Sequence, residues 1–147
     1  MATVDPPHLT SLLSAVQSLA PTIAAERQRL DTERELSPGL INALVEAGLF
    51  RLWTPRELGG AELDPVSGLR VIAAVSELDG SVGWNVMISS AYSFFAGRLA
   101  APVAETIYGD SRAAVAGQLQ PGHAAVAPKG LEVPGRVLFG MKPKGII

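Results

Sequence analysis

The sequence predicts a mainly α fold of about five helices, followed by the first strands of a β-domain. Three observations support this prediction. Apolar residues recur at three- and four-residue steps as far as residue 108, cap-and-proline signals separate the helical stretches, and the pattern changes after Gly109. We therefore divide the chain into an N-terminal helical domain, residues 1–110, and the start of a truncated β-domain, residues 111–147.

The first two helices follow from apolar spacing and end signals. The first runs from Leu9 to about Leu30, and Pro21 inside it predicts a kink or a break. Ser37-Pro38 combines an N-cap serine with a proline at the first helical position, so a second helix begins there. This helix ends near Gly48, because glycine is common just after a helix.

Two further end signals define the middle of the chain. Residues 50–63 are a predicted loop, in which the Gly59-Gly60 pair permits backbone angles that other residues avoid. Asp64-Pro65 repeats the cap-and-proline signal and begins a third helix. Asp79-Gly80-Ser81 ends that helix and caps a fourth, residues 82–99, which is apolar on most sides. We expect this fourth helix to be the central and most buried one.

The rest of the chain contains one short helix and then a different pattern. Residues 102–108 form the predicted fifth helix, and residues 113–119 and 131–139 are predicted strands. An isolated two-stranded hairpin is marginally stable in water. These strands therefore need the helices, another chain or further sequence to pack against.

Composition excludes several functions. The chain has no cysteine, so thiolate metal sites, disulfides and cysteine nucleophiles are excluded. Its net charge is −2, with no basic patch for nucleic acid or membrane, and no carboxylate spacing indicates a metal site. The serines at positions 89, 90 and 93 lack the glycine elbow of a hydrolase. No signal peptide or bilayer-length segment is evident, so we expect a soluble cytoplasmic protein.

Three segments resemble a known family. Residues 46–60, EAGLFRLWTPRELGG, resemble the signature after the second helix of acyl-CoA dehydrogenases. Residues 79–85, DGSVGWN, are similar to a turn of the flavin-dependent monooxygenase branch of that superfamily, which includes aromatic hydroxylases. Residues 116–121, AGQLQP, and 130–136, GLEVPGR, resemble the first strand, the flavin-facing loop and the second strand of its β-domain.

The resemblance implies a flavin-dependent oxidoreductase, present here as an N-terminal fragment. It favours the oxygenase component of a two-component monooxygenase acting on an aromatic or similar small substrate. Its flavin, FMN or FAD, would be reduced by a separate flavin reductase, and the family implies a homo-oligomer. The alternative branch, acyl-CoA dehydrogenase, would show a Thr-Glu-Pro-Gly-like run at residues 119–122. We expect this chain alone to be inactive, because later segments complete the flavin site.

A third possibility is a non-catalytic truncated helical module that at most binds a partner. Two departures from the family pattern bear on it. Pro121-Gly122-His123 is one residue short of the family's proline-x-glycine loop, and a serine that lies near the flavin in the family is absent from residues 139–142. Retention of flavin by the purified chain would separate the module from the enzyme.

The resemblance and the pattern together give candidate site residues. Trp84 is expected beside the flavin or the aromatic substrate, with a core tryptophan as the equal alternative. The candidate flavin-edge loop offers backbone N–H groups to the cofactor, with an ordinary turn as the alternative; it comprises Gln118, Leu119, Gln120 and Pro121. Asn85 and Tyr92 are candidate substrate-binding residues, although a hydrogen bond to backbone is the commoner reason for such groups on an apolar helix.

No catalytic residue is assigned from the sequence. His123 matches no family catalytic position, and a solvent-exposed loop histidine is the favoured interpretation. Arg51 and Arg56 lie in the loop that leads to Gly59-Gly60. They are interpreted as solvated charges, with the steering of an anionic ligand as the alternative.

Overall fold

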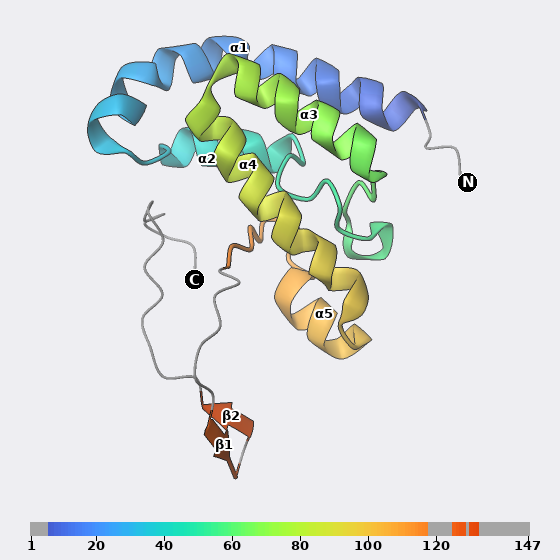
Figure 1. Cartoon of the computed structure of the whole chain (residues 1–147). Helices are drawn as coiled ribbons and strands as arrows, with labels where there is room; N and C mark the ends of the chain where they lie inside the picture. The colour runs from blue at the N-terminus through green and yellow to red at the C-terminus, as the bar shows by residue number, and fades with distance from the viewer. Residues whose placement is uncertain (1–5, 118–124, 129, 133–147) are drawn as a thin grey trace.

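Helices make up most of the residues that the computed structural model describes, which are 6–117, 125–128 and 130–132 (Figure 1). The chain order is α1 (Pro6–Glu33), α2 (Pro38–Glu46), the 3-10 helix η1 (Arg56–Leu58), α3 (Pro65–Leu78), α4 (Gly80–Ser93), the 3-10 helix η2 (Phe94–Arg98) and α5 (Ala101–Tyr108). Two short strands follow, β1 (Ala125–Ala127) and β2 (Gly130–Glu132). The predicted mainly α class is confirmed.

The core lies where α3 packs between α1 and α4, with α2 against α1 (Figure 1). Its innermost side chains are aliphatic and come from all four of these helices: Val16, Ile23, Leu40, Leu44, Val71, Val75, Val82 and Val86. Burial of each such side chain contributes about 1.5–3 kcal/mol. The apolar stripes read from the sequence therefore meet in one contiguous core.

Helix α1 continues through Pro21 without a break. Of the two outcomes predicted at Pro21, the break is therefore wrong and the kink stays a prediction. Proline removes one hydrogen-bond donor from the helix, and both Pro21 and Gln17, whose carbonyl loses its partner, are exposed to solvent. Water can satisfy that carbonyl, while the buried Val16 and Ile23 hold the two halves of α1 on the core.

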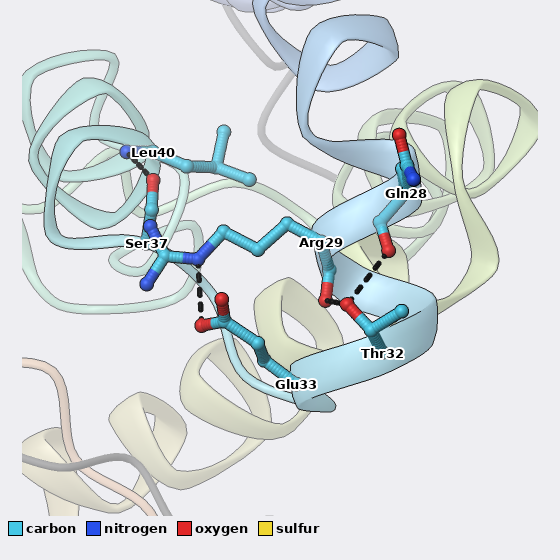
Figure 2. Close-up of polar contacts among 6 residues, drawn as sticks. All are labelled: Gln28, Arg29, Thr32, Glu33, Ser37 and Leu40. Carbon is cyan, nitrogen blue, oxygen red and sulfur yellow. Dashed lines mark hydrogen bonds and ion pairs between the residues drawn. The ribbon is translucent and has the colours of Figure 1, made fainter.

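A compact polar corner joins α1 to α2, as Figure 2 shows. Thr32 Oγ1 donates to the carbonyl oxygens of Gln28 and Arg29 at 3.0 and 3.2 Å, and Arg29 pairs with Glu33 at 2.8 Å. The chain then turns, and the Ser37 hydroxyl accepts the backbone N–H of Leu40 at 3.0 Å. The predicted serine cap is confirmed; such a cap stabilises a helix by about 1 kcal/mol.

Helix α2 ends as the sequence predicts, with Gly48 in the left-handed region at φ 71°. The backbone N–H of Gly48 donates to Val45 O, and the backbone N–H of Leu49 donates to Leu44 O. This pair of hydrogen bonds is the Schellman motif. In the following loop, Gly59 has φ 77°, and a Cβ on Gly60 would lie 2.1 Å from the carbonyl oxygen of Thr54. Both glycines of the predicted pair are therefore required by the backbone.

Two aspartates cap the central helices. The Asp64 carboxylate accepts the N–H groups of Val66 and Ser67 at the start of α3. Asp79 both ends α3 and caps α4, accepting from Ser81 and Val82. Both predicted caps are confirmed, and no residue separates Asp79 from either helix. The turn between α3 and α4 is consequently very short, and the two helices pack as an antiparallel pair.

The strand predictions are wrong in one segment and lie largely outside the described residues in the other. Residues 113–117 form no strand; instead Ala114 packs against the helical core, so the prediction is wrong for this segment. Residues 118–119 and 133–139 lie outside the described residues. Strands β1 and β2 pair antiparallel, with Ala125 opposite Glu132, and Figure 1 shows this hairpin apart from the helices. A β-domain beyond it stays a prediction.

Candidate functional site

One side of α4 and η2 is left partly uncovered by the described residues. It presents a row at helical spacing that we call the open face: Trp84, Asn85, Ile88, Tyr92 and Phe95. Trp84 is 53% exposed and Phe95 39%. Helix α4 has more buried residues than any other described helix, as expected, but the expectation is wrong for Trp84 and for the two phenylalanines of η2, which are exposed. The pattern failed because a helix that is apolar all round does not reveal which side its own chain covers.

Gly83 sets the rotation of α4 that exposes Trp84. A Cβ on Gly83 would lie 2.1 Å from Ser76 Oγ and 2.7 Å from Ser76 Cα, so α3 and α4 approach each other closely here. Successive residues of a helix are about 100° apart. With Gly83 pressed against α3, Trp84 turns away from that contact and into the open. Among the residues that the structure describes, Trp84 is therefore not a fully buried core tryptophan.

Asn85 makes a local hydrogen bond. Its Nδ2 donates to the carbonyl oxygen of Ser81, one turn earlier, at 2.9 Å. The side chain is half-buried beside Trp84. The backbone hydrogen bond expected of a polar group on an apolar helix is therefore present, and a role in substrate binding stays a prediction.

Tyr92 lies where three segments meet. Its ring is 6.1 Å from that of Phe95, centroid to centroid, and its carbonyl oxygen accepts the Tyr108 hydroxyl at 2.8 Å. A Cβ on Gly117 would lie 2.5 Å from Cε1 of the Tyr92 ring, so only glycine lets the backbone after α5 come this close. Burial raises the pKa of Tyr108, which keeps its hydroxyl protonated as the donor.

The contact with Gly117 connects the open face to the candidate flavin-edge loop in the sequence. Gln118, Leu119, Gln120 and Pro121 begin at the next residue, but they lie outside the described residues, as does His123. The structure thus brings Trp84, Asn85 and Tyr92 onto one helix face and leads the chain past Tyr92 at residue 117. The binding role of the four loop residues stays a prediction.

Sequence reasoning missed the environment of Arg51. This side chain is only 5% exposed, and its guanidinium donates to the backbone carbonyls of Leu58, Tyr108 and Asp110. Burial lowers the pKa of Arg51, and the Asp110 charge opposes that shift. The interpretation as a solvated charge is wrong for Arg51 and right for Arg56, which is exposed. Arg51 stands between two apolar residues, Phe50 and Leu52, and this was the local sequence signal that could have indicated its burial.

Two buried serines of α4 make structural hydrogen bonds. Ser90 Oγ donates to Leu49 O at 3.1 Å and Ser93 Oγ to Ser90 O at 2.7 Å, so these hydroxyls hold the helix in place. On η2, beside the open face, the Arg98 guanidinium lies 5.3 Å from the centroid of the Phe94 ring. Such a contact favours a cation over the ring and leaves the ring in its exposed position.

Within the part of the chain that the structure describes, no three His, Cys, Asp or Glu side chains gather as metal ligands would. The helices described there also lack a stretch that is both apolar and long enough to cross a bilayer.

Comparison with known proteins gives a family and several relatives. The family "Acyl-CoA dehydrogenase, N-terminal domain" matches residues 10–101. An indole-3-acetate monooxygenase of Pseudomonas putida is 33% identical over 116 residues, which are 76% of this chain and 30% of that protein. The oxygenase subunit HsaA of a flavin-dependent monooxygenase from Rhodococcus jostii is 26% identical, over 67% of this chain and 26% of that protein.

Solved structures agree on the fold. HsaA monooxygenase from M. tuberculosis superposes with a TM-score of 0.79 at 26% identity, covering 86% of this chain and 34% of that one. XiaF from Streptomyces sp., solved with FADH2 and glycerol, gives a TM-score of 0.81 at 24% identity, covering 86% of this chain and 33% of that one. The chain spans about a third or less of the length of these proteins.

Proposed function

Since the chain belongs to the acyl-CoA dehydrogenase N-terminal domain family, we propose that it forms the helical side of the active site of a two-component flavin-dependent monooxygenase. The observation that carries this proposal is the open face of α4 and η2, on which the described residues leave Trp84 and Phe95 substantially exposed. The relatives named above as flavin-dependent or indole-3-acetate monooxygenases support the monooxygenase branch over the dehydrogenase branch.

The residues present fit one side of a site for a planar ring system. Trp84 offers a half-exposed aromatic surface on a rigid, capped helix, and the glycine at position 117 brings the backbone against the Tyr92 ring. Aromatic rings bind one another by stacked or edge-to-face packing worth about 0.5–1.5 kcal/mol beyond area burial. A flavin ring or an aromatic substrate suits such a surface, whereas a highly charged ligand does not.

In this proposal the residues of the chain position and shield. Trp84 contacts the ring system, and Asn85 and Tyr92 orient the substrate. Gln118, Leu119, Gln120 and Pro121 offer backbone N–H groups to the flavin edge. The apolar side chains of the open face exclude water, which strengthens polar interactions inside the site. The bound reduced flavin, FMN or FAD, supplies the activation of oxygen.

The proposal extends to the assembly. Residues 1–110 form the helical unit and residues 111–147 begin a β-domain. A separate reductase supplies the reduced flavin, as the designation of HsaA as an oxygenase subunit supports. We further propose a cytoplasmic homo-oligomer that acts on a small aromatic substrate, with indole-3-acetate as the first compound to test.

The test uses the complete reading frame that contains these residues. The purified protein is titrated anaerobically with reduced FMN and reduced FAD, then assayed with a flavin reductase, NADH, oxygen and a panel of aromatic acids and phenols. We expect binding of reduced flavin and an oxygen-dependent hydroxylated product. Trp84→Ala should weaken flavin or substrate binding about tenfold, the loss of one to two aromatic contacts, whereas Val66→Ala, an exposed apolar residue on α3, should not.

Two results would overturn the proposal. A protein that binds neither reduced flavin, while its helices remain folded, would support the non-catalytic helical module. Flavin-dependent oxidation of an acyl-CoA thioester without hydroxylation would move the protein to the dehydrogenase branch.

A further inference from the structure

A buried arginine connects three distant backbone segments next to the open face. The Arg51 guanidinium donates through Nη1 to Asp110 O at 2.9 Å, and through Nη2 to Tyr108 O at 2.6 Å and to Leu58 O. Leu58 ends η1 in the loop that contains Gly59 and Gly60. Tyr108 ends α5, and Asp110 lies in the segment that follows α5. One side chain therefore fixes where the chain leaves α5 relative to the loop after α2.

The acceptors are arranged for a cation. The last carbonyls of a helix have no partner within it and carry partial negative charge, so a buried positive group is favoured at the end of α5. Burial of a charge is costly unless hydrogen bonds satisfy it. Lysine cannot substitute fully, because its single ammonium lacks the rigid fork that reaches separate carbonyls at once.

The fixed segment leads directly to the open face. The carbonyl of Asp110 accepts both Arg51 Nη1 and the backbone N–H of Ala113, at 2.9 and 3.0 Å, so the arginine braces the turn after α5. Four residues later Gly117 lies against the Tyr92 ring. The Tyr108 hydroxyl, bonded to Tyr92 O, ties the same end of α5 to α4.

We propose that Arg51 is a positioning residue: it holds the chain after α5 so that Gly117 lies on the Tyr92 ring at the edge of the open face. The inference deepens the proposed function, since this edge borders the proposed flavin and substrate site. Arg51 itself is buried within its carbonyl cage and does not touch the ligand; it acts through residues 110–117.

Two measurements report the positioning without any flavin. The first is the NMR shift of the Gly117 α-protons, which the Tyr92 ring displaces as long as the two are in contact. The second is amide hydrogen exchange at Ala113, whose N–H is protected by the braced turn. Arg51→Lys is the test variant, and Arg56→Lys, an exposed arginine in the same loop, is the matched control.

We expect Arg51→Lys to keep its helical circular dichroism but to lose the ring-induced shift at Gly117. Ala113 exchange should accelerate about tenfold or more, since losing a hydrogen bond to a charged donor changes a local opening equilibrium by that order. Arg56→Lys should change neither signal. An unchanged Gly117 shift and unchanged Ala113 exchange in Arg51→Lys would overturn the proposal.

A second variant covers the case in which Arg51→Lys does not fold. Gly117→Ala adds a methyl group where the Tyr92 ring lies and leaves Arg51 and its acceptors intact. The ring contact should be lost while Ala113 exchange stays within about twofold of the parent protein, as expected for a turn whose brace is intact. Fast exchange at Ala113 in this variant would show that the ring contact, and not Arg51, fixes the segment. Because no flavin is involved, either failure is separate from a failure of the proposed function.

Discussion

The two sides of α4 differ in how completely this chain covers them. Toward α3, Val82 and Val86 have no exposed surface, and Gly83 is pressed against Ser76. On the opposite side, Trp84 and Phe95 remain substantially exposed. The same helix thus has one buried face and one partly exposed face.

In our proposal, the covered side of α4 serves the stability of the fold and the open face serves contact with a ligand. A tryptophan offers about 150–250 Å² of surface for burial, so leaving half of it in water forfeits about 2 kcal/mol at 25 cal/mol per Å². On the side of α4 toward α3, Val82 and Val86 are fully buried and forfeit no such free energy. The open face is therefore better explained by an external ring or surface than by the needs of this fold, and substitutions on the two sides should have different consequences.

The largest effect on stability is expected at Gly83. In Gly83→Ala the new methyl group meets the Ser76 backbone, and the strain outweighs the helix-forming advantage of alanine. We expect a net loss of about 2 kcal/mol in the free energy of unfolding, measured by urea denaturation. Gly80→Ala is the matched control on the same helix, because a Cβ there meets nothing within 4 Å; it should be neutral or slightly stabilising. Equal effects at both glycines would contradict a close α3–α4 crossing.

Removal of the shared cap should cost less. Asp79→Ala leaves the N–H groups of Ser81 and Val82 without their side-chain acceptor. The expected loss is about 1 kcal/mol in the free energy of unfolding. Asp79→Asn should restore most of it, since asparagine caps comparably. Failure of asparagine to rescue would show that charge, and not the hydrogen bonds, sustains this turn.

On the open side, Trp84→Ala should cost less than the loss of a buried core tryptophan. Half of the side chain is already in solvent, so by the same bookkeeping of buried area we expect a loss of about 1–2 kcal/mol in the free energy of unfolding. Thermal unfolding of the parent and the variant gives the comparison. A loss as large as the roughly 3–5 kcal/mol typical of buried aromatic residues would mean that this chain does cover the face.

The smallest effect concerns pH. Hydrogen bonds from the Ser67 side chain and from the backbone of Ser67 and Val66 lower the pKa of Asp64 below its ordinary 3.8. A carboxylate with a lowered pKa stabilises the native state above 3.8, and that contribution disappears as the pH falls through the folded value. The stability difference between the parent and Asp64→Asn should therefore be constant near neutral pH and shrink in acid. A difference independent of pH would contradict an ionised cap.

Local features of this fold could be predicted, and long-range ones could not. The caps at Ser37, Asp64 and Asp79 act on N–H groups two or three residues away, so their signals lie within a few letters of sequence. The burial of Arg51 depends on carbonyls 57 and 59 residues later, which no local pattern contains. The exposure of Trp84 depends on which distant residues pack against its side of α4, and the local pattern does not contain that information either.

The same distinction explains the strand prediction at residues 113–119. A sequence rich in β-forming residues indicates a preference for extended backbone but does not identify a strand to pair with. Residues 113–117 instead lie along the helices, with Gly117 on the Tyr92 ring. Trp84, Asn85 and Tyr92, which were singled out separately in the sequence, lie on one face of α4; their role in binding stays a prediction. The role of residues 118–121 stays a prediction from resemblance.

The most direct test of the central idea, that the open face of α4 borders a flavin site, is a fluorine NMR titration. The protein of the complete reading frame is labelled with 5-fluorotryptophan, the signals of Trp84 and Trp53 are assigned by substitution, and reduced flavin is added anaerobically. Trp53 packs against Gly68 on α3 and serves as the internal reference. We predict that the Trp84 signal shifts on flavin binding and the Trp53 signal does not. Flavin binding that leaves Trp84 unshifted would contradict the account.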